Sequence, residues 1–485
     1  MSKQNKFVKD MTQGTPWKLL LQFAVPLFIG NIFQQLYNMV DSIIVGNYVS
    51  SNALGAIGTT NSLHFFFFSL VGGLSVGIGI IVAQFFGAEN EEKVKDTIGN
   101  AIWIITAGSI IMAFIGFFAA RQVLILLDTD PVILEDAVAY LKVTSIGICC
   151  MGLYNGVSGI LRALGDSKTP LFFLIFASIV NVVLDFVFVL AFDWGVVGVA
   201  VATAFAQFLS AITCIIYAYK SNTYFRLKKQ NFKLQVAIFK KSLRLGIPVA
   251  LQNSLIAFSL IVLQKVVNSY GANFTTAFTV VTRIETLIQQ PFMSLGAAMS
   301  TYTGQNLGAG KVKRVIKGFN SANVLNTIFA LVVIAVFWLF TPQIVSIFGD
   351  DSHVLKIAVD GLRITSCFYL FLGLIYPTRN VLNGAGDAMF SLFTGIVECI
   401  GCLLYTSDAA DDMQCIGRVG LAYPLTLIPF LGSYGVFYAT GLTWLLNGLF
   451  SLVRYKRGKW KTINLVKLNN EPADIEESAQ TDSYA

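Results

Sequence analysis

The sequence predicts an all-α polytopic membrane protein, with twelve transmembrane helices in two pseudo-symmetric six-helix lobes. The chain of 485 residues is 55% apolar and only 13% charged, whereas soluble domains are about one quarter charged. Apolar stretches of about 20 residues recur along its whole length, and each is long enough to cross a bilayer core. The two halves of the chain also share motifs, which indicates an internal repeat.

Twelve apolar stretches define the predicted spans. They cover residues 17–45, 52–86, 95–120, 137–162, 170–192, 195–219, 242–268, 275–304, 319–347, 359–383, 389–430 and 432–453. The first lacks a small-residue cleavage site after a short apolar core, so it is predicted to be a retained span rather than a signal peptide. The predicted domains are an amino-terminal segment (1–16), an N-lobe (17–219), a linker (220–241), a C-lobe (242–453) and a tail (454–485). The end of that tail is acidic and is expected to be disordered.

Basic residues concentrate in alternate loops. Lys and Arg are frequent in the linker, at 311–317 and at 454–461, but absent from 46–51 and 269–274. The positive-inside rule therefore places both termini in the cytoplasm of a multi-pass protein of the plasma (inner) membrane. Two termini on one side require an even number of spans, which agrees with twelve.

The repeat aligns residues 17–220 with 241–453. It pairs Pro26 in "FAVPLFIGN" with Pro248 in "LGIPVALQN", "AQFFGA" at 83–88 with "GQNLGA" at 304–309, and "LRALGD" at 161–166 with "LNGAGD" at 382–387. The offset in this last pair is 221 residues. It rises to 237 where "GVVGVAVAT", ending at Thr203, matches "GSYGVFYAT", ending at Thr440. The second half therefore holds 16 extra residues.

These extra residues are predicted to be 402–417, inside the eleventh span. "ECIG" at 398–401 recurs as "QCIG" at 414–417, and removing 402–417 shortens the span from 42 to 26 residues. "CLLYTSDAADD" is similar to a translated transposase adapter from sequencing libraries, so we interpret the segment as an artefact. The alternative is an acidic loop inside the membrane, but its three aspartates would cost roughly 8–10 kcal/mol at the bilayer centre. Resequencing the gene from genomic DNA distinguishes the two.

Two acids in the first half are the main functional candidates, because ionisable groups inside spans are costly. Asp41 lies in "QQLYNMVDSIIVG" and Asp185 in "SIVNVVLDFVFV", and neither has a basic residue nearby in its own span. A carboxylate in such a site has an increased proton affinity, and its oxygens could instead bind Na⁺. Asp185 shares a helical face with Asn181. The polar residues preceding Asp41 are Gln34, Gln35 and Asn38, for which we expect roles in the substrate cavity or in gating.

The second half carries ionisable residues for which we expect roles in gating or in the substrate cavity. Glu398 and Arg418 would be four residues apart without the insert, a spacing that favours an ion pair within one helix. Arg283 and Glu285 are two apart and do not share a helical face, so their partners must be elsewhere. Lys265 and Arg379 are further cations without an assigned role.

Enzyme chemistry is not expected. No phosphate-binding loop and no Ser/His/Asp arrangement is present, and the two histidines, His64 and His353, are far apart. We therefore predict no enzyme activity, no metal centre and no cofactor. The seven cysteines lie mostly in apolar segments, so no disulfide framework is expected.

Four stretches of the sequence carry a family resemblance, namely "VPLFIGNIFQQLYNMVDSIIVG", "GAENEEKVKDTI", "LRALGDSKTP" and "NVVLDFVF". Through them, the chain resembles the multidrug and toxic compound extrusion (MATE) family over residues 15–455. The resemblance implies two lobes around a central cavity and the exchange of organic cations or amphiphiles for H⁺ or Na⁺. Carried over by motif, it implies a cation site at Asp41, Asn181, Asp185 and Thr203. The chain departs from members with acids in their seventh and tenth spans, because no acid is seen in those membrane cores.

Three functions are compatible with these features. The favoured one is secondary active multidrug efflux by alternating access of the two lobes, coupled to H⁺ or Na⁺. The alternatives are a lipid-linked oligosaccharide flippase of similar architecture and a non-transporting membrane scaffold. A flippase would need several cations in its cavity, and Arg283, Lys265 and Arg379 are few. We expect small amphiphilic or cationic substrates, contact with membrane lipid, no nucleic-acid partner and a monomer.

Overall fold

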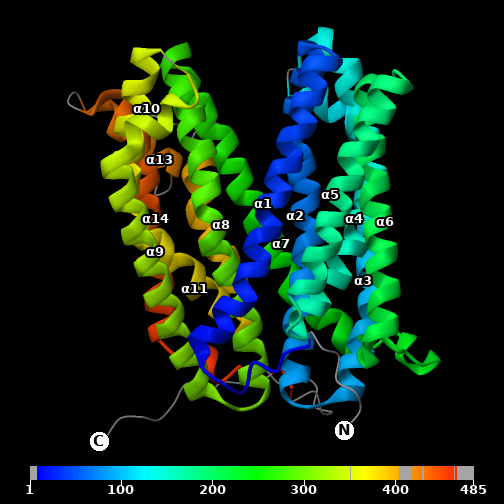
Figure 1. The fold of residues 1–485 in the computed structure, drawn as a ribbon. Coiled ribbons are helices and arrows are strands. Elements are labelled where there is room, and N and C mark those ends of the chain that lie inside the picture. Colours follow the sequence, from blue (N-terminus) through cyan, green and yellow to red (C-terminus); the bar gives the residue numbers. More distant parts are fainter. Residues whose placement is uncertain are drawn as a thin grey trace, which may run out of the picture.

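The computed structural model describes residues 8–127, 129–349, 351–403, 418–428, 431–463 and 465–466. These residues form helices and connecting segments without a strand. Figure 1 shows two helical bundles side by side, with the first and last described segments of the chain at the same end of the molecule. The predicted all-α fold with two lobes is thus confirmed. Most of the predicted insert, residues 404–417, lies outside the described residues, as does the acidic tail from residue 467.

The first lobe contains six α-helices. They are α1 (Pro16–Tyr48), α2 (Ser51–Gly87), α3 (Glu91–Leu126), α4 (Pro131–Ala163), α5 (Lys168–Phe186), which continues into the π-helical η1 (Val187–Ala191), and α6 (Gly195–Ser221). Polar side chains start several of them, because the first N–H groups of a helix lack partners within it. Ser50 accepts a hydrogen bond from the amide of Ala53, and Asn90 accepts one from the amide of Lys93.

A short linker leads to the second lobe. The linker contains η2 (Thr223–Phe225) and η3 (Lys229–Phe232). The second lobe contains α7 (Val236–Asn268), α8 (Ala272–Gly308), α9 (Val312–Ser346), α10 (Ser352–Ser366), α11 (Tyr369–Ala385), α12 (Ala388–Leu403), α13 (Arg418–Leu427), η4 (Gly432–Tyr434), α14 (Gly435–Lys456) and η5 (Lys459–Lys461).

The described helices can be compared with the twelve predicted crossings. Among the described residues, nine helices are long and apolar enough to span a membrane, and α10 with α11 forms a tenth span that bends by 52°. The 37-residue α8 is long enough but more polar. The pair α12 and α13 flanks the undescribed segment at the predicted eleventh span.

The tenth span differs from the prediction of one helix over 359–383. It breaks between α10 and α11, where three consecutive side chains bond to backbone carbonyls of the preceding turn. Thr365 bonds to Leu362 O, and both Ser366 and Cys367 bond to Arg363 O. Such bonds compete with the helical ladder and bend helices.

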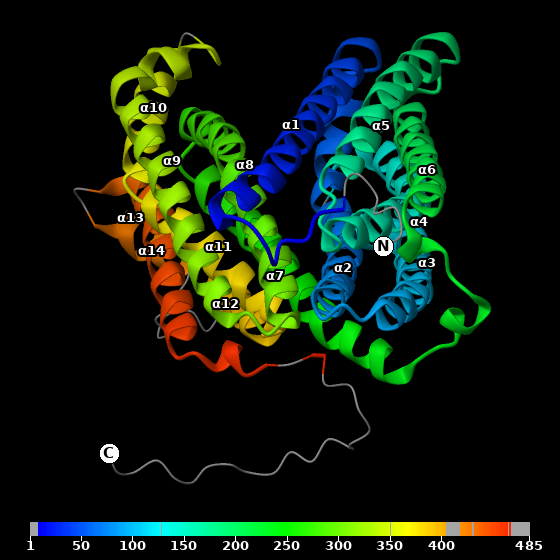
Figure 2. The same ribbon diagram turned by 60° about the horizontal axis from the view of Figure 1, so that its bottom comes forward.

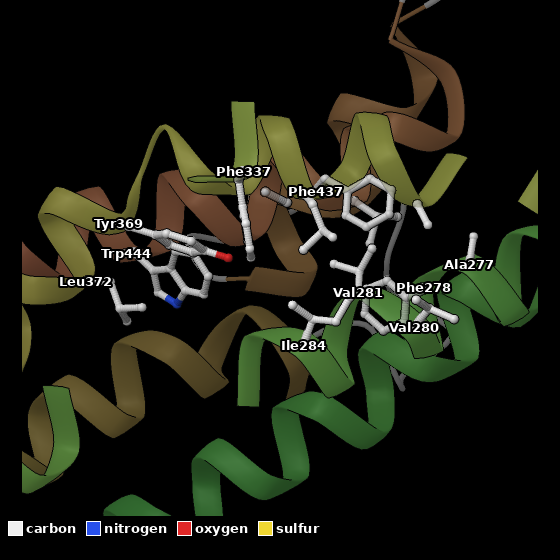
Figure 3. Close-up of a cluster of buried hydrophobic side chains, with 14 of the residues drawn as sticks. Ala277, Phe278, Val280, Val281, Ile284, Phe337, Tyr369, Leu372, Phe437 and Trp444 are labelled. Carbon is white, nitrogen blue, oxygen red and sulfur yellow. The ribbon is translucent and has the colours of Figure 1, made fainter. Parts of the chain in front are cut away.

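The second lobe has a continuous aromatic core. Figure 3 shows side chains from α8, α9, α11 and α14 packed together. Phe437 lies between α14 and α8 with its ring centroid 5.9 Å from that of Phe278, and Tyr369 is at the same distance from Trp444. Aromatic pairs in this range add to the stability gained from burial.

The lobes meet mainly through the carboxyl-terminal half of α2. A Cβ atom at Gly73 would lie 2.5 Å from the backbone nitrogen of Ala250 in α7, and one at Gly77 would lie 2.5 Å from that of Gly246. Only glycine at these positions therefore allows α2 and α7 to pack this closely. Residues 77–85 of α2 are mostly buried, whereas many of those in its first turns are exposed. The bundles therefore join near the carboxyl-terminal end of α2 and diverge toward the opposite end (Figure 2).

Candidate functional site

Four residues predicted to form a cation site lie together in the first lobe. Asn181 donates a hydrogen bond to Thr203 Oγ1 at 3.3 Å, which joins α5 to α6. The carboxyl groups of Asp41 in α1 and Asp185 in α5 lie within hydrogen-bonding reach of each other. Asp185 is 0% exposed. The site thus joins three helices from distant parts of the sequence.

Several oxygen atoms in this cluster have no hydrogen-bond donor in the described part of the chain. They are Asp41 Oδ1, Asn181 Oδ1, both carboxylate oxygens of Asp185, and Gln207 Oε1. A buried acceptor without a donor costs about 1–3 kcal/mol, and most buried polar atoms in proteins have a partner. A group of such acceptors can bind a cation or a hydrogen-bond donor.

No basic side chain neutralises the two acids in the described residues. The four ion pairs found there lie elsewhere and join Lys93 to Asp96, Lys95 to Glu91, Arg121 to Glu135, and Arg454 to Asp387. The groups that interact with Asp41 and Asp185 include the phenols of Tyr37 and Tyr140. Two carboxylates are both acceptors, so they can share a hydrogen bond only when one of them carries a proton.

A small cavity borders the cluster. Its volume is about 10 Å³, which is on the scale of one water molecule. It is lined by Tyr37, Ala177, Ser178, Asn181, Thr203, Ala206 and Gln207. The cavity and the unpaired oxygens together can accept a proton, a water molecule or a small cation.

The backbone changes its winding next to the cluster. Asp185 is the penultimate residue of α5, and the π-helical η1 begins at Val187. Single π-helical turns are rare and frequently occur at functional sites, because they rotate the side chains that follow. The side chains of η1 therefore point in other directions than they would on a continuous α-helix.

The other predicted residues of α1 are near the cluster or face outward. Gln34 lies within hydrogen-bonding reach of Tyr37. Gln35 is half-buried and Asn38 is exposed. Of these three, Gln34 therefore has a described link to the acids, through Tyr37.

Among the described side chains, the predicted residues of the second lobe form no shared site with Asp41 and Asp185. In α8, Arg283 is exposed while Glu285 is buried beside Tyr369 of α11. Lys265 is exposed, and the guanidinium of Arg379 lies 5.4 Å from the ring centroid of Tyr376.

The predicted pairing of Glu398 with Arg418 stays a prediction. The backbones of these residues belong to α12 and α13, but their side chains lie outside the described residues.

Three residues of the cluster are missing from the sequence prediction. Tyr37 precedes Asp41 by four residues and Gln207 follows Thr203 by four, so helical spacing alone would have indicated both. Tyr140 comes from α4, and no local pattern points to it.

A family comparison now identifies the chain. The family model described as MatE matches it twice, at residues 26–187 and 248–402. The chain belongs to the MatE family. The two matches begin at Pro26 and Pro248, which the predicted repeat aligns, and the repeat is confirmed. The second match ends at Cys402, where the predicted insert begins.

Relatives and solved structures support this membership. The chain is 30% identical to the probable multidrug resistance protein YpnP of Bacillus subtilis, over 94% of this chain and 98% of the relative. It is 22% identical to the probable multidrug resistance protein NorM of Thermotoga maritima, over 92% and 93%. A structure described as an outward-facing multidrug resistance MATE family transporter has a TM-score of 0.84 at 24% identity, over 94% of this chain and 99% of that one. This MatE protein therefore has the fold of solved family members.

Proposed function

We propose that this MatE protein is a secondary active multidrug exporter, which exchanges organic cations or amphiphilic drugs for H⁺ or Na⁺. The observation that carries the proposal is the group of unpaired oxygens around Asp41 and Asp185, buried in the first lobe without a counter-charge. Relatives named as multidrug resistance proteins support the substrate class.

The coupling ion binds at Asp41, Asn181, Asp185 and Thr203. One proton shared between the two carboxyl groups removes their repulsion and gives each an otherwise missing hydrogen bond. A sodium ion does the same through the oxygens of the cluster, since hard cations prefer carboxylate and amide oxygens. In either case the loaded site has a different charge from the empty one.

Exchange follows if the coupling ion and the drug prefer different arrangements of the lobes. A ligand shifts such an equilibrium only by its difference in affinity for the two states. With both termini in the cytoplasm of a plasma-membrane protein, the arrangement in Figure 1 is closed on the cytoplasmic side. Loading of the acids from outside then precedes the opening of the cytoplasmic side to the drug.

The test is export of a fluorescent organic cation from proteoliposomes under separately imposed H⁺ and Na⁺ gradients. We expect the wild type to export the dye with one gradient, and Asp185→Asn to lose more than nine tenths of that flux. The matched control is Asp193→Asn, which makes the same change at an exposed acid in the loop before α6. This control should export normally.

The alternatives give different results. Wild-type flux in Asp185→Asn would show that Asp185 is not required for coupling and would contradict the proposed coupling site. Translocation of a lipid-linked sugar without dye export would indicate a flippase, and no flux of either kind under any gradient would indicate a scaffold.

A further inference from the structure

Two glutamines related by the repeat bridge the lobes in opposite directions. Gln84 in α2 donates its side-chain amide to the carbonyl of Gly384 at 2.9 Å, and Gln305 in α8 donates to the carbonyl of Ala163 at 2.9 Å. Both glutamines are almost completely buried. Each lobe therefore supplies a donor to the other.

The acceptors are also related by the repeat. Ala163 is the third residue of "LRALGD" and Gly384 is the third of "LNGAGD". These residues lie at the carboxyl-terminal ends of α4 and α11, where carbonyls have no donor in their own helix. A buried carbonyl without a donor is costly, so the two glutamine bonds stabilise the closed junction.

Two glycines let the helices approach closely enough for these bonds. A Cβ atom at Gly87 would lie 1.9 Å from the carbonyl oxygen of Gln305, and one at Gly308 would lie 2.0 Å from that of Gln84. The obstructing atoms belong to the backbone and cannot rotate away. The ends of α2 and α8 thus make a reciprocal contact with approximate two-fold symmetry.

The amino-terminal segment breaks this symmetry. The amide of Met11 donates to Gln305 Oε1 at 2.8 Å, and its carbonyl accepts from Asn306 at 3.1 Å. Met11 is 0% exposed. The segment before α1 therefore holds one of the two glutamines in its bridging orientation.

We propose that Gln84 and Gln305 form the gate that keeps the two lobes together on the side of the chain termini. Both bonds cross from one lobe to the other, so both must break when the lobes separate at this end. The gate rests on the proposed function, because separation there is the step that exposes the drug site to the cytoplasm. When the junction opens, water replaces the glutamine donors at both carbonyls. Each bond therefore stabilises the closed junction only by the net free energy of a hydrogen bond relative to water.

The test measures how often this junction opens. Ser242 in α7 is 1% exposed and its backbone carbonyl lies close to Gly77 of α2, so Ser242→Cys reports on the junction in the full chain with the native cysteines replaced by serine. The rate of its modification by a maleimide is proportional to the open fraction. Gln84→Met and Gln305→Met keep the side-chain volume but remove the donor. Gln305→Met also removes the acceptor of the Met11 amide, a bond that does not cross to the first lobe.

We expect each variant to increase the modification rate about fivefold, since a net hydrogen bond contributes about 1 kcal/mol. The double variant should increase it about 25-fold if the two bonds add. Two controls exclude general loosening. Gln264→Met removes a glutamine that bonds to Asn268 within α7, and a reporter cysteine at Ser366 samples the interior of the second lobe. Both should keep the parental rate.

A rate in the double variant within twofold of the parent overturns the gate, and so does an equal increase at Ser366. As a second route, Gly87→Ala should open the junction without changing either glutamine, and an unchanged rate there also contradicts the proposal. The measurement uses purified protein without drug or gradient. The absence of dye export would therefore not contradict the gate. An unchanged modification rate would likewise not contradict the coupling site.

Discussion

Asp185→Asn should make the folded protein more stable while it removes coupled transport. Asp185 is completely buried, and neither of its carboxylate oxygens has a donor. It also faces a second acid, Asp41, one oxygen of which has no donor either. Such a site is retained for binding rather than for stability, because function commonly requires a destabilised site.

The size of the effect follows from these atoms. An orphaned buried acceptor costs about 1–3 kcal/mol. The substitution converts one oxygen of residue 185 into a donor, which can bond to Asp41, and it removes a like charge from beside Asp41. One acceptor stays unsatisfied, so the net gain in the free energy of unfolding is about 2 kcal/mol. With an unfolding entropy of about 2.1 cal/mol/K per residue over 485 residues, this raises the Tm by about 2 °C.

The assay is thermal unfolding of purified wild type and Asp185→Asn in sodium-free buffer at pH 8, followed by tryptophan fluorescence. The difference should shrink in acid, because a proton on the wild-type pair supplies the missing donor. If Na⁺ is the coupling ion, it should stabilise the wild type by about 2.7 kcal/mol at 100 times its Kd and leave the variant unchanged. Asp193→Asn should differ from the wild type by less than about 0.5 kcal/mol.

A variant that unfolds at a lower temperature than the wild type at pH 8 would refute this reasoning. It would mean that the charged form of Asp185 is stabilised in the closed arrangement.

Two further predictions concern the segments at the terminal end of the lobes. Trp460 is 1% exposed and stacks on Tyr455 at 5.2 Å, so Trp460→Ala should lower the free energy of unfolding by about 3 kcal/mol, measured by thermal denaturation. Asp96 accepts hydrogen bonds from Asn231 at 2.8 Å and Gln235 at 2.7 Å. Asp96→Ala should therefore release the linker from α3 and speed its cleavage by trypsin at least tenfold, because each bond to a charged group contributes about 1.5–3 kcal/mol.

Each of these predictions has a clear contrary result. A loss below 1 kcal/mol in Trp460→Ala would mean that α14 does not depend on this side chain. An unchanged cleavage rate in Asp96→Ala would mean that other contacts hold the linker, such as the bond from Trp103 to Phe232 O at 2.9 Å.

The sequence predicts the two lobes and singles out the two acids as candidates, because both signals depend on local composition. A carboxylate inside an apolar segment can be recognised from the sequence alone, and motifs that align between the two halves indicate a repeat. The meeting of Asp41 with Asp185 depends on how α1 packs against α5, and spacing alone does not contain that information. It came from the family resemblance. The position of Tyr140 beside the acids could not be predicted for the same reason, since its own span holds no motif that links it to them.

The bend between α10 and α11 could not be predicted for a different reason. Its sequence signal is a run of side chains that bond to the preceding turn, beginning at Thr365. The same bonds occur at Thr59 and Thr60 inside α2, which continues unbroken to Gly87. Whether such bonds bend a helix depends on the packing around it, and packing is a property of the whole lobe.

The segment before α1 has a practical consequence for anyone who produces this protein. Met11 is bonded to the end of α8, and Lys311 and Arg314 of the same lobe bond to Thr12 and Gly14. A shortened gene product that starts at the first helix would lose all of these bonds. A purification tag is better fused to the carboxyl terminus, where it leaves the residues that tie the start of the chain to the second lobe unchanged.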